Sequence, residues 1–345
     1  MNIARALRDE LVHILDAVAI VSPAAFTFAG NPSGGLSMPM MGMQIAPGTP
    51  PLMAELTNQL YLHCFSNRFT GQIARTEPPR FEKDAAWVES LSRANHGRDR
   101  WEDGWRVMQG MPNGQVVAKR GAETRMLGPG EFVNLGGSGM FLPPDAPVRV
   151  YVPHESLTMQ PGYYFMFGET QGDSSDQLSV VRFYWNVPAE GAPQLVNLLS
   201  TELNRWQVPF RFKTGTNPAI LSRRDSAVLY TPRRYAEIAC ELASGVQQSM
   251  TGLLRPEVPL FTLRLADGLA FAEDPGTQES FGQSRCRILA QGIWLAHQRG
   301  ARQAQDRLAA VAEQFQSEGI SLARPWLNAG SADDLAFAAL RAEAA

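Results

Sequence analysis

Apolar side chains recur every three to four positions in several stretches of the chain, which is the period of a helix with one buried face. Residues 3–19 are the first such stretch, and their stripe consists of Leu7, Leu11, Ile14, Leu15 and Val18. The same period predicts helices over residues 52–69, 82–94, 193–205, 232–252 and 279–316, the last with a break near Gly300. Residues 30–51 have no period and are rich in Gly, Pro and Met, which predicts a long loop, disordered or acting as a lid.

The pattern changes after Trp101 to short segments in which apolar and polar residues alternate, as in half-buried strands. The turn Pro112-Asn113-Gly114 predicts a hairpin that joins Trp105–Gln109 to Gln115–Arg120. Further strands are expected at residues 148–154, 162–168, 178–187, 207–214 and 226–230. No internal repeat or linker is visible. We therefore expect residues 1–345 to form one α+β domain: a helical N-terminal cap (1–95) and a body (100–345) with a central, mainly antiparallel sheet and C-terminal helices.

Composition excludes several classes of function. A formal net charge of −3 argues against a general nucleic-acid binder, which needs a basic surface to replace counterions. The longest apolar runs are far shorter than the roughly 20 residues that span a bilayer, and residues 1–20 do not resemble a secretory signal. The three cysteines are far apart and odd in number, which favours buried thiols and a cytoplasmic location.

Common catalytic motifs are missing from the sequence. The run Gly136-Gly137-Ser138-Gly139 lacks the Lys-Ser/Thr ending of a P-loop. There is no kinase signature set, no nucleophile elbow, and no cysteine or histidine spacing typical of zinc. ATP use, serine hydrolysis and zinc hydrolysis are therefore poor hypotheses.

The chemistry that remains is cationic. Between residues 205 and 234 there are seven positive side chains: Arg205, Arg211, Lys213, Arg223, Arg224, Arg233 and Arg234. Strand alternation places Arg211 and Lys213 on one face of the strand at 207–214, opposite the apolar Phe212. In the strand at 178–187 the same rule places Arg182, Tyr184 and Asn186 together. Such rows suit a pocket for an anion, although arginines flanking strands are more often solvated or ion-paired.

An anion pocket that contains a lysine would suit β-elimination of phosphate, because the weakly acidic Cα–H needs a nearby uncharged base. Only three of the 31 basic residues are lysines, and Lys213 is one of them. An ammonium can lose its proton whereas a guanidinium cannot. The charge of Arg211 nearby would favour the neutral amine of Lys213 by electrostatic repulsion.

Several blocks of the sequence, in order, resemble the HopA effector-like family. They are VSPAAFTFAG (21–30), LYLHCFSNRFTG (60–71), YVPHESLTMQPGYYFMFGE (151–169), VRFYWNVPAEGAPQLVNLLSTELNRWQVPFRFKTG (181–215), SRRDSAVLY (222–230) and DPGTQESFGQSRCRILAQG (274–292). The resemblance implies the lyase component of class V lanthipeptide and thioviridamide-type biosynthesis. Such a lyase eliminates phosphate from phosphoserine or phosphothreonine of a ribosomal precursor peptide, giving dehydroalanine or dehydrobutyrine, after a separate aminoglycoside-phosphotransferase-like kinase has acted.

The resemblance also implies roles for residues of this chain, without any cofactor or metal. Lys213 would be the base, and His154 or Tyr184 the acid. The ligands of the phosphate would be Arg182, Arg211, Arg224 and Arg285. Asp225, Glu279 and Asn186 would support them, the two carboxylates by orienting arginines.

Two other interpretations remain open at this stage. A HopA-like protein that binds a phosphopeptide or a partner kinase without elimination needs only cations, so an arginine would serve in place of Lys213. A type III effector acting in a host cell is the other. Neither a nucleic acid nor a membrane is an expected partner.

Overall fold

A seven-stranded antiparallel sheet forms the centre of the computed structural model, which describes residues 3–33, 49–73, 82–136 and 142–335. Its strands run in the order β14-β15-β11-β13-β12-β10-β9. Their bounds are β9 (Glu155–Ser156), β10 (Tyr163–Phe167), β11 (Val180–Trp185), β12 (Arg211–Gly215), β13 (Ala227–Pro232), β14 (Leu263–Ala266) and β15 (Leu269–Glu273). The predicted α+β fold with a central antiparallel sheet is confirmed, and the predicted strands at 178–187, 207–214 and 226–230 are neighbours within it.

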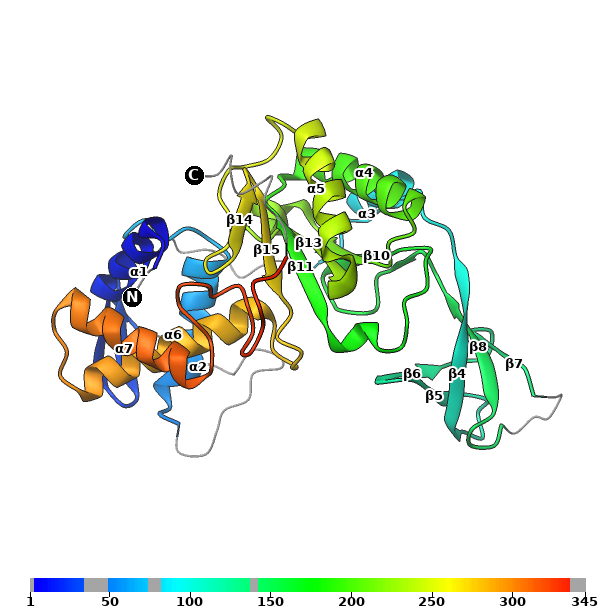
Figure 1. The fold of residues 1–345 in the computed structure, drawn as a ribbon, viewed down its shortest axis with the longest axis horizontal. Helices are drawn as coiled ribbons and strands as arrows, with labels where there is room; N and C mark the ends of the chain where they lie inside the picture. The colour runs from blue at the N-terminus through cyan, green and yellow to red at the C-terminus, as the bar shows by residue number, and fades with distance from the viewer. Residues whose placement is uncertain (1–2, 34–48, 74–81, 137–141, 336–345) are drawn as a thin grey trace.

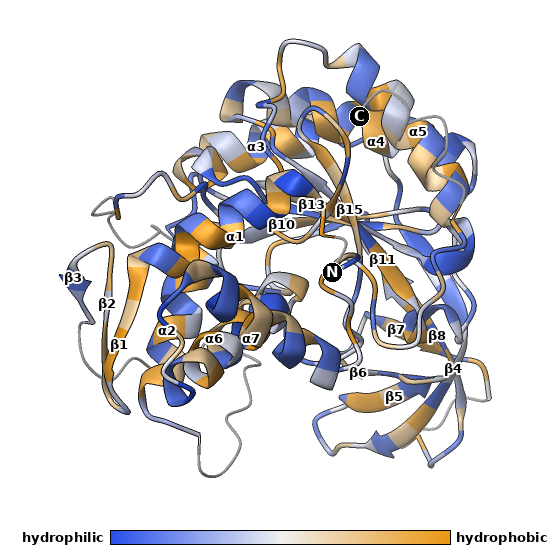
Figure 2. Cartoon of the chain, turned by 60° about the vertical axis from the view of Figure 1, so that its left-hand side comes forward, coloured by the Kyte–Doolittle hydropathy of each residue, from blue (hydrophilic) through white to orange (hydrophobic). Residues whose placement is uncertain are grey.

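Helices cover both faces of this sheet (Figure 1). One face packs against α3 (Ala85–Ala94), α4 (Ala192–Arg205) and α5 (Ala236–Ser249) around a core that includes Phe183, Phe212 and Leu229. The helices α1 (Arg5–Ala17), α2 (Leu52–Leu60), α6 (Phe281–Gln298) and α7 (Ala304–Ser317) form a lobe on the other face. Apolar residues of these helices, orange in Figure 2, are buried in this lobe. The N-terminal helices and the C-terminal helices therefore share one hydrophobic core.

A separate five-stranded sheet projects from the body (Figure 1). It contains β4 (Arg100–Gly110), β5 (Val116–Arg120), β6 (Glu123–Leu127), β7 (Phe132–Asn134) and β8 (Pro147–Val152), in the order β6-β5-β4-β8-β7. The predicted hairpin is confirmed, since Val107 pairs with Ala118 across β4 and β5. The strand expected at 148–154 belongs to this small sheet and not to the central one. Trp105 is fully buried in its core.

The N-terminal cap is less helical than predicted. The first helix ends at Ala17, and the chain continues as β1 (Val18–Ser22), which pairs with β2 (Ala25–Phe28) and then β3 (Asn31–Pro32). The β-branched residues that follow Ala17 favour this extended backbone. The second predicted helix changes at Tyr61 into a π-helical turn that ends at Phe65. Most of the predicted loop at 30–51 falls on residues 34–48, outside the described part of the chain.

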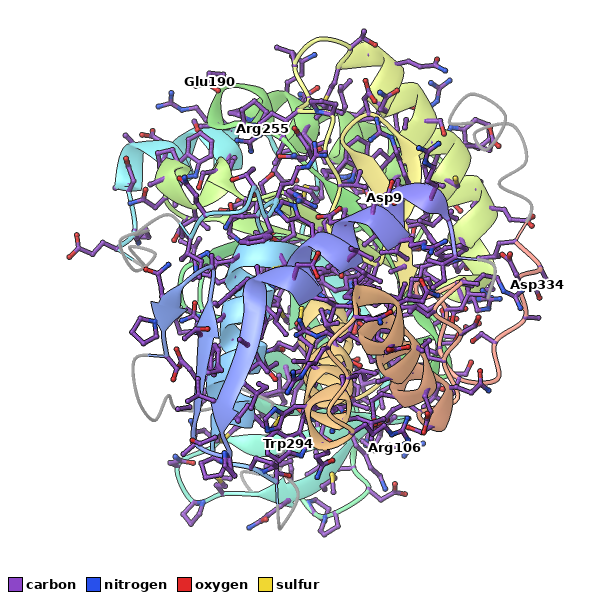
Figure 3. All side chains as sticks on the ribbon, turned by 90° about the vertical axis from the view of Figure 1, so that its left-hand side faces the viewer. Asp9, Arg106, Glu190, Arg255, Trp294 and Asp334 are labelled. Carbon is purple, nitrogen blue, oxygen red and sulfur yellow. The ribbon has the colours of Figure 1, made fainter. Side chains whose placement is uncertain are left out.

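The long C-terminal helix expected at 279–316 consists of α6 and α7, separated at Gly300 as predicted. Gly300 has a φ of +66°, in the left-handed region that favours glycine. Ser280 and Gln283 form a capping box at the start of α6. Figure 3 faces this lobe and labels Asp9 on α1 and Trp294 on α6. Within the described ranges, no helix has the length and apolar character needed to cross a membrane.

Gly282 provides a test of the packing between α6 and the π-helical turn. A Cβ at this position would lie 2.5 Å from Phe65 Cε1, and Phe65 is itself buried. Gly282→Ala should therefore destabilise the protein by about 1–3 kcal/mol, as overpacking of a core does. The control is Gly245→Ala in α5, where a Cβ meets nothing within 4 Å and Ala favours the helix. Urea unfolding of both variants measures the difference, and equal stability of the two would contradict this packing.

Candidate functional site

The register of the central sheet brings four predicted residues onto one face. Arg211 on β12 pairs with Tyr230 on β13, which pairs with Arg182 on β11. Two residues further along β12, Lys213 pairs with Val228 on β13, which pairs with Tyr184 on β11. Paired residues of neighbouring strands point to the same side of a sheet. The two polar rows expected from alternation in separate strands therefore form one surface, which we call the cationic face (Arg182, Tyr184, Arg211, Lys213 and Tyr230).

The Arg182 end of the cationic face is closed by the helical lobe. Arg182 donates to Asp274, with Nε and Nη2 at 2.7 and 2.6 Å from Oδ2, so its charge is paired. Its Nη1 lies 3.5 Å from the Tyr184 hydroxyl. Tyr184 packs against the rings of Phe65 and Phe281, and burial raises the pKa of its hydroxyl. At this end the face is part of the core.

The Arg211 end is only partly buried. The Arg211 guanidinium lies 4.7 Å from the centre of the Tyr230 ring, and Arg182 lies 5.2 Å from the same ring. Lys213 Nζ lies 4.2 Å from the centre of the Tyr163 ring and donates to Gln160 Oε1 at 3.3 Å. Among the described residues, neither Arg211 nor Lys213 has a carboxylate within ion-pair distance.

Tyr230 was not among the predicted site residues, although it occupies the middle of the cationic face. Burial raises its pKa, but the charges of Lys213, Arg182 and Arg211 outweigh that effect and lower the pKa below its ordinary value. The sequence contained one signal for it. Alternation along the strand at 226–230 puts Val228 and Tyr230 on one side, but the pairing of this strand with the Arg211 strand was not predicted.

A second charged group borders Lys213. Asp225 accepts two hydrogen bonds from Arg223, at 2.8 and 2.7 Å, and Arg223 also donates to the Tyr61 hydroxyl at 2.8 Å. Burial raises the pKa of Asp225, but the charges of Arg223 and then of Lys213 outweigh it and keep the pKa low. Asp225 does orient an arginine, as the sequence suggested, but that arginine is Arg223 and not a predicted phosphate ligand.

Two of the predicted phosphate ligands are engaged elsewhere in the fold. Arg224 is buried, with Nη1 on the Val258 carbonyl at 2.9 Å and Nη2 on Glu10 at 3.1 Å. Arg285 is 1% exposed and donates to the carbonyls of Pro325 and Leu327 at 2.7 and 2.9 Å, and burial lowers its pKa to about 10. Both guanidiniums hold distant segments together, and the structure does not bring them onto the cationic face.

The remaining predicted residues also have structural partners. Glu279 accepts from Arg287 at 3.0 and 3.1 Å. Asn186 joins the end of β11 to the Glu257 carbonyl and to Arg255. His154 contacts Asp99 through Nδ1 at 2.6 Å, next to the start of β4. In the sheet, Phe167 stands between the His154 position and Arg211, so the histidine lies two strands away from the nearest cation of the face.

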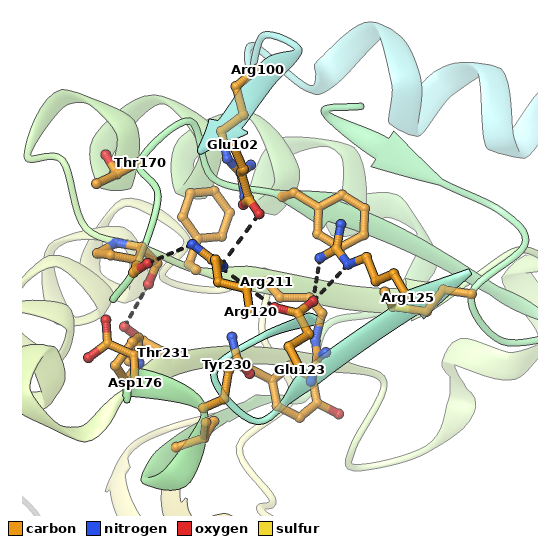
Figure 4. Close-up of a pocket in the computed structure, with 18 residues that line it drawn as sticks. Arg100, Glu102, Arg120, Glu123, Arg125, Thr170, Asp176, Arg211, Tyr230 and Thr231 are labelled. Atoms are coloured by element: carbon orange, nitrogen blue, oxygen red, sulfur yellow. Dashed lines mark hydrogen bonds and ion pairs between the residues drawn. The ribbon is translucent and has the colours of Figure 1, made fainter. Parts of the chain in front are cut away.

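An open pocket lies between the Arg211 end of the cationic face and the five-stranded sheet (Figure 4). Arg211 and Tyr230 line one wall. The opposite wall is a ladder of alternating charges: Arg100, Glu102, Arg120, Glu123 and Arg125. With Arg211, and with Asp176 that also lines the pocket, the charged lining residues carry four positive and three negative charges, an excess of one positive charge. The pocket can therefore favour an anion.

No metal is suggested by the arrangement of ligands. Within the part of the chain that the structure describes, no three His, Cys, Asp or Glu side chains are grouped to hold a metal ion. The four guanidiniums that line the pocket bind anions and not cations.

Comparisons with known proteins find one matching family model and similar solved structures. The model of the HopA1 effector protein family matches residues 154–327, about half of the chain and the part that contains the central sheet. An effector protein from Pseudomonas syringae pv. tomato strain DC3000 is 24% identical with a TM-score of 0.37, and the match covers 48% of this chain and 62% of that one. An effector protein from Pseudomonas syringae pv. syringae strain 61 is 15% identical with a TM-score of 0.39, covering 79% and 88%. No curated protein matches the chain.

Unfolding measurements can separate structural arginines from those of the site. Arg224→Met should cost about 1–3 kcal/mol, because it leaves the partly buried Val258 carbonyl and Glu10 without their donor. Arg211→Met should cost less than about 1 kcal/mol, because no carboxylate in the described structure depends on it. Thermal unfolding at neutral pH provides both values. A loss for Arg211→Met as large as for Arg224→Met would mean that Arg211 is there to stabilise the fold.

Proposed function

The chain belongs to the HopA1 effector protein family, and from that premise we propose that it is a lyase that eliminates phosphate from phosphoserine or phosphothreonine in a peptide. The observation that supports this proposal best is the juxtaposition of Arg211, which lines the open pocket, and Lys213 on the cationic face, both without a carboxylate partner among the described residues. One of them is a permanent cation, and the other can act as a base.

In this proposal Arg211 is the main ligand of the phosphate. A phosphorylated residue carries about −1.5 to −2 charges near pH 7, and the residues that line the pocket carry an excess of one positive charge. Arg182 lies on β11, two strands away from Arg211 on β12, and contributes the electric field of its charge. Its guanidinium is held by Asp274. A planar guanidinium binds a phosphate through two parallel hydrogen bonds, which a lysine cannot reproduce. Arg224 and Arg285 have no part in this version of the site.

Lys213 is proposed as the base that removes the Cα proton. Its amine is positioned by the Tyr163 ring and by the Gln160 side-chain amide, and neither of these is a carboxylate. Removal of the Cα proton and loss of phosphate would leave dehydroalanine from phosphoserine and dehydrobutyrine from phosphothreonine. The expected substrate is a ribosomal precursor peptide that a separate aminoglycoside-phosphotransferase-like kinase has phosphorylated.

Two other candidates have some support. The family is described as one of effector proteins, which favours a type III effector acting on a host phosphoprotein. A protein that binds a phosphopeptide without elimination would use the same pocket, and this candidate predicts that Lys213 is replaceable by arginine. Both candidates are distinguished from the lyase by the product formed.

The activity itself can be tested with phosphoserine and phosphothreonine peptides. The purified protein should remove about 98 Da, the mass of phosphoric acid, from each site by general acid–base chemistry. Mass spectrometry of the peptide measures this change, and addition of a thiol should label the new double bond. A loss of about 80 Da with return of the hydroxyl would identify a phosphatase instead. Capture of the peptide without any mass change would favour a binding protein.

Lys213→Arg separates a base from a simple cation. The variant keeps the positive charge but has no neutral amine near pH 7, so elimination should fall by about 10³-fold, within the usual range for loss of a general base. Affinity for the phosphopeptide should stay within a few-fold. Lys119→Arg is the matched control, because Lys119 is exposed on β5. If Lys213→Arg eliminates phosphate as fast as this control, Lys213 is not the base.

A further inference from the structure

We propose that Tyr230 is the acid that protonates the departing phosphate, and that Lys213 then returns a proton to it. The proposal rests on the proposed lyase activity and deepens it, because it names the second proton-transferring group of the same site. It differs from the expectation drawn from the sequence, which favoured His154 or Tyr184.

Position favours Tyr230 over both earlier candidates. Tyr230 lines the open pocket together with Arg211, its partner in the register of the sheet. Tyr184 lies deeper, packed among the rings of Phe65 and Phe281. His154 is bonded to Asp99 on the far side of Phe167. Tyr230 is therefore the phenol of the cationic face that a phosphate on Arg211 would meet.

The surroundings of Tyr230 favour release of its proton. Guanidiniums lie on both sides of the ring, at 4.7 Å for Arg211 and 5.2 Å for Arg182. Together with Lys213 they stabilise a phenolate, so the pKa of Tyr230 lies below its ordinary value although burial alone would raise it. None of the described residues makes a hydrogen bond to its hydroxyl, which leaves that oxygen available to a ligand.

Lys213 and Tyr230 can share one proton. An ammonium with a phenolate has the same net charge as an amine with a phenol, so a proton can move from one group to the other without changing the charge of the site. A phosphate dianion bound at Arg211 repels the phenolate and favours the second form. Substrate binding would thus produce the neutral base and the protonated acid together, which offsets the tendency of the phosphate to keep Lys213 charged.

The proposed elimination conserves atoms and charge. The Cα proton passes to Lys213 Nζ while the Cα–Cβ double bond forms and the Cβ–O bond breaks. The phenolic proton of Tyr230 passes to the bridging oxygen, so the phosphate leaves as a hydrogen phosphate dianion and not as a trianion. The Lys213 ammonium then returns a proton to the Tyr230 phenolate, and the amine and the phenol are restored without any other reactant.

Tyr230→Phe tests the acid role when it is assayed on two leaving groups. With a phosphoserine peptide, elimination should fall by about 10²–10⁴-fold, the usual effect of losing a general acid, while phosphopeptide affinity stays within a few-fold. With the corresponding O-sulfoserine peptide, the ratio of variant to wild-type rates should stay close to one, because sulfate leaves without a proton. Tyr235→Phe is the matched control, since Tyr235 also lies beside an arginine, Arg234, but outside the pocket.

A second replacement guards against a variant that does not fold. Difluorotyrosine at position 230 keeps the ring and the hydroxyl but has a lower pKa, so the alkaline limb of the kcat profile should move to lower pH. Tyr230→Phe with wild-type elimination, an equal loss on phosphate and sulfate, or an unmoved alkaline limb would each overturn the acid role. If the wild-type protein eliminates neither group, the proposed lyase activity fails, which is a different outcome from failure of the acid role alone.

Discussion

Three positive side chains on one face of a sheet whose other face is a closed apolar core are the constraint on which this structure depends. Charges removed from water without partners are very costly. Arg182 is covered by the helical lobe and is paired with Asp274. Arg211 and Lys213 have no carboxylate partner among the described residues, and Arg211 lines an open pocket. At the Arg182 end of the cationic face, the charge is therefore paired and covered. At the Arg211 end, the charge has no carboxylate partner among the described residues and the pocket gives access to it.

The small sheet has a place in the same arrangement. Its charged ladder forms the wall opposite Arg211, and this wall must be fixed in place for the pocket to keep its shape. Arg100 on β4 donates to the carbonyl of Gly168, just beyond β10. Asp99 accepts hydrogen bonds from Tyr151 and His154, which lower its pKa to about 2. The histidine that the sequence suggested as an acid is thus hydrogen-bonded to Asp99 at the junction of the two sheets.

The alternation of side chains within single strands was enough to predict the two polar rows. Arg211 and Lys213 emerge opposite Phe212, as expected, and Arg182 and Tyr184 share a side of β11. The order of the strands was not predictable from the same pattern, because pairing depends on the whole sheet. The strand order places Tyr230 between Arg211 and Arg182, so the pattern of single strands did not identify it as a site residue. The prediction from alternation was therefore correct about which side chains share a strand face, and it did not include the neighbouring strand.

Arginines with structural partners were the other difficulty. Arg224 and Arg285 look no different in sequence from Arg211, since all three lie in cationic or helical segments near the predicted strands. Their partners come from remote parts of the chain: Glu10 is 214 positions from Arg224, and Pro325 is 40 positions from Arg285. Only the tertiary structure shows which guanidinium makes its hydrogen bonds within the protein and which one can bind a ligand.

The central claim is that the cationic face breaks a Cα–H bond, and the fate of that hydrogen tests it most directly. A phosphoserine peptide deuterated at Cα should lose the deuterium together with the phosphate, more slowly than the unlabelled peptide when proton removal limits the rate. Mass spectrometry of the product distinguishes the outcomes. Release of phosphate with the deuterium retained would show attack at phosphorus and would contradict elimination.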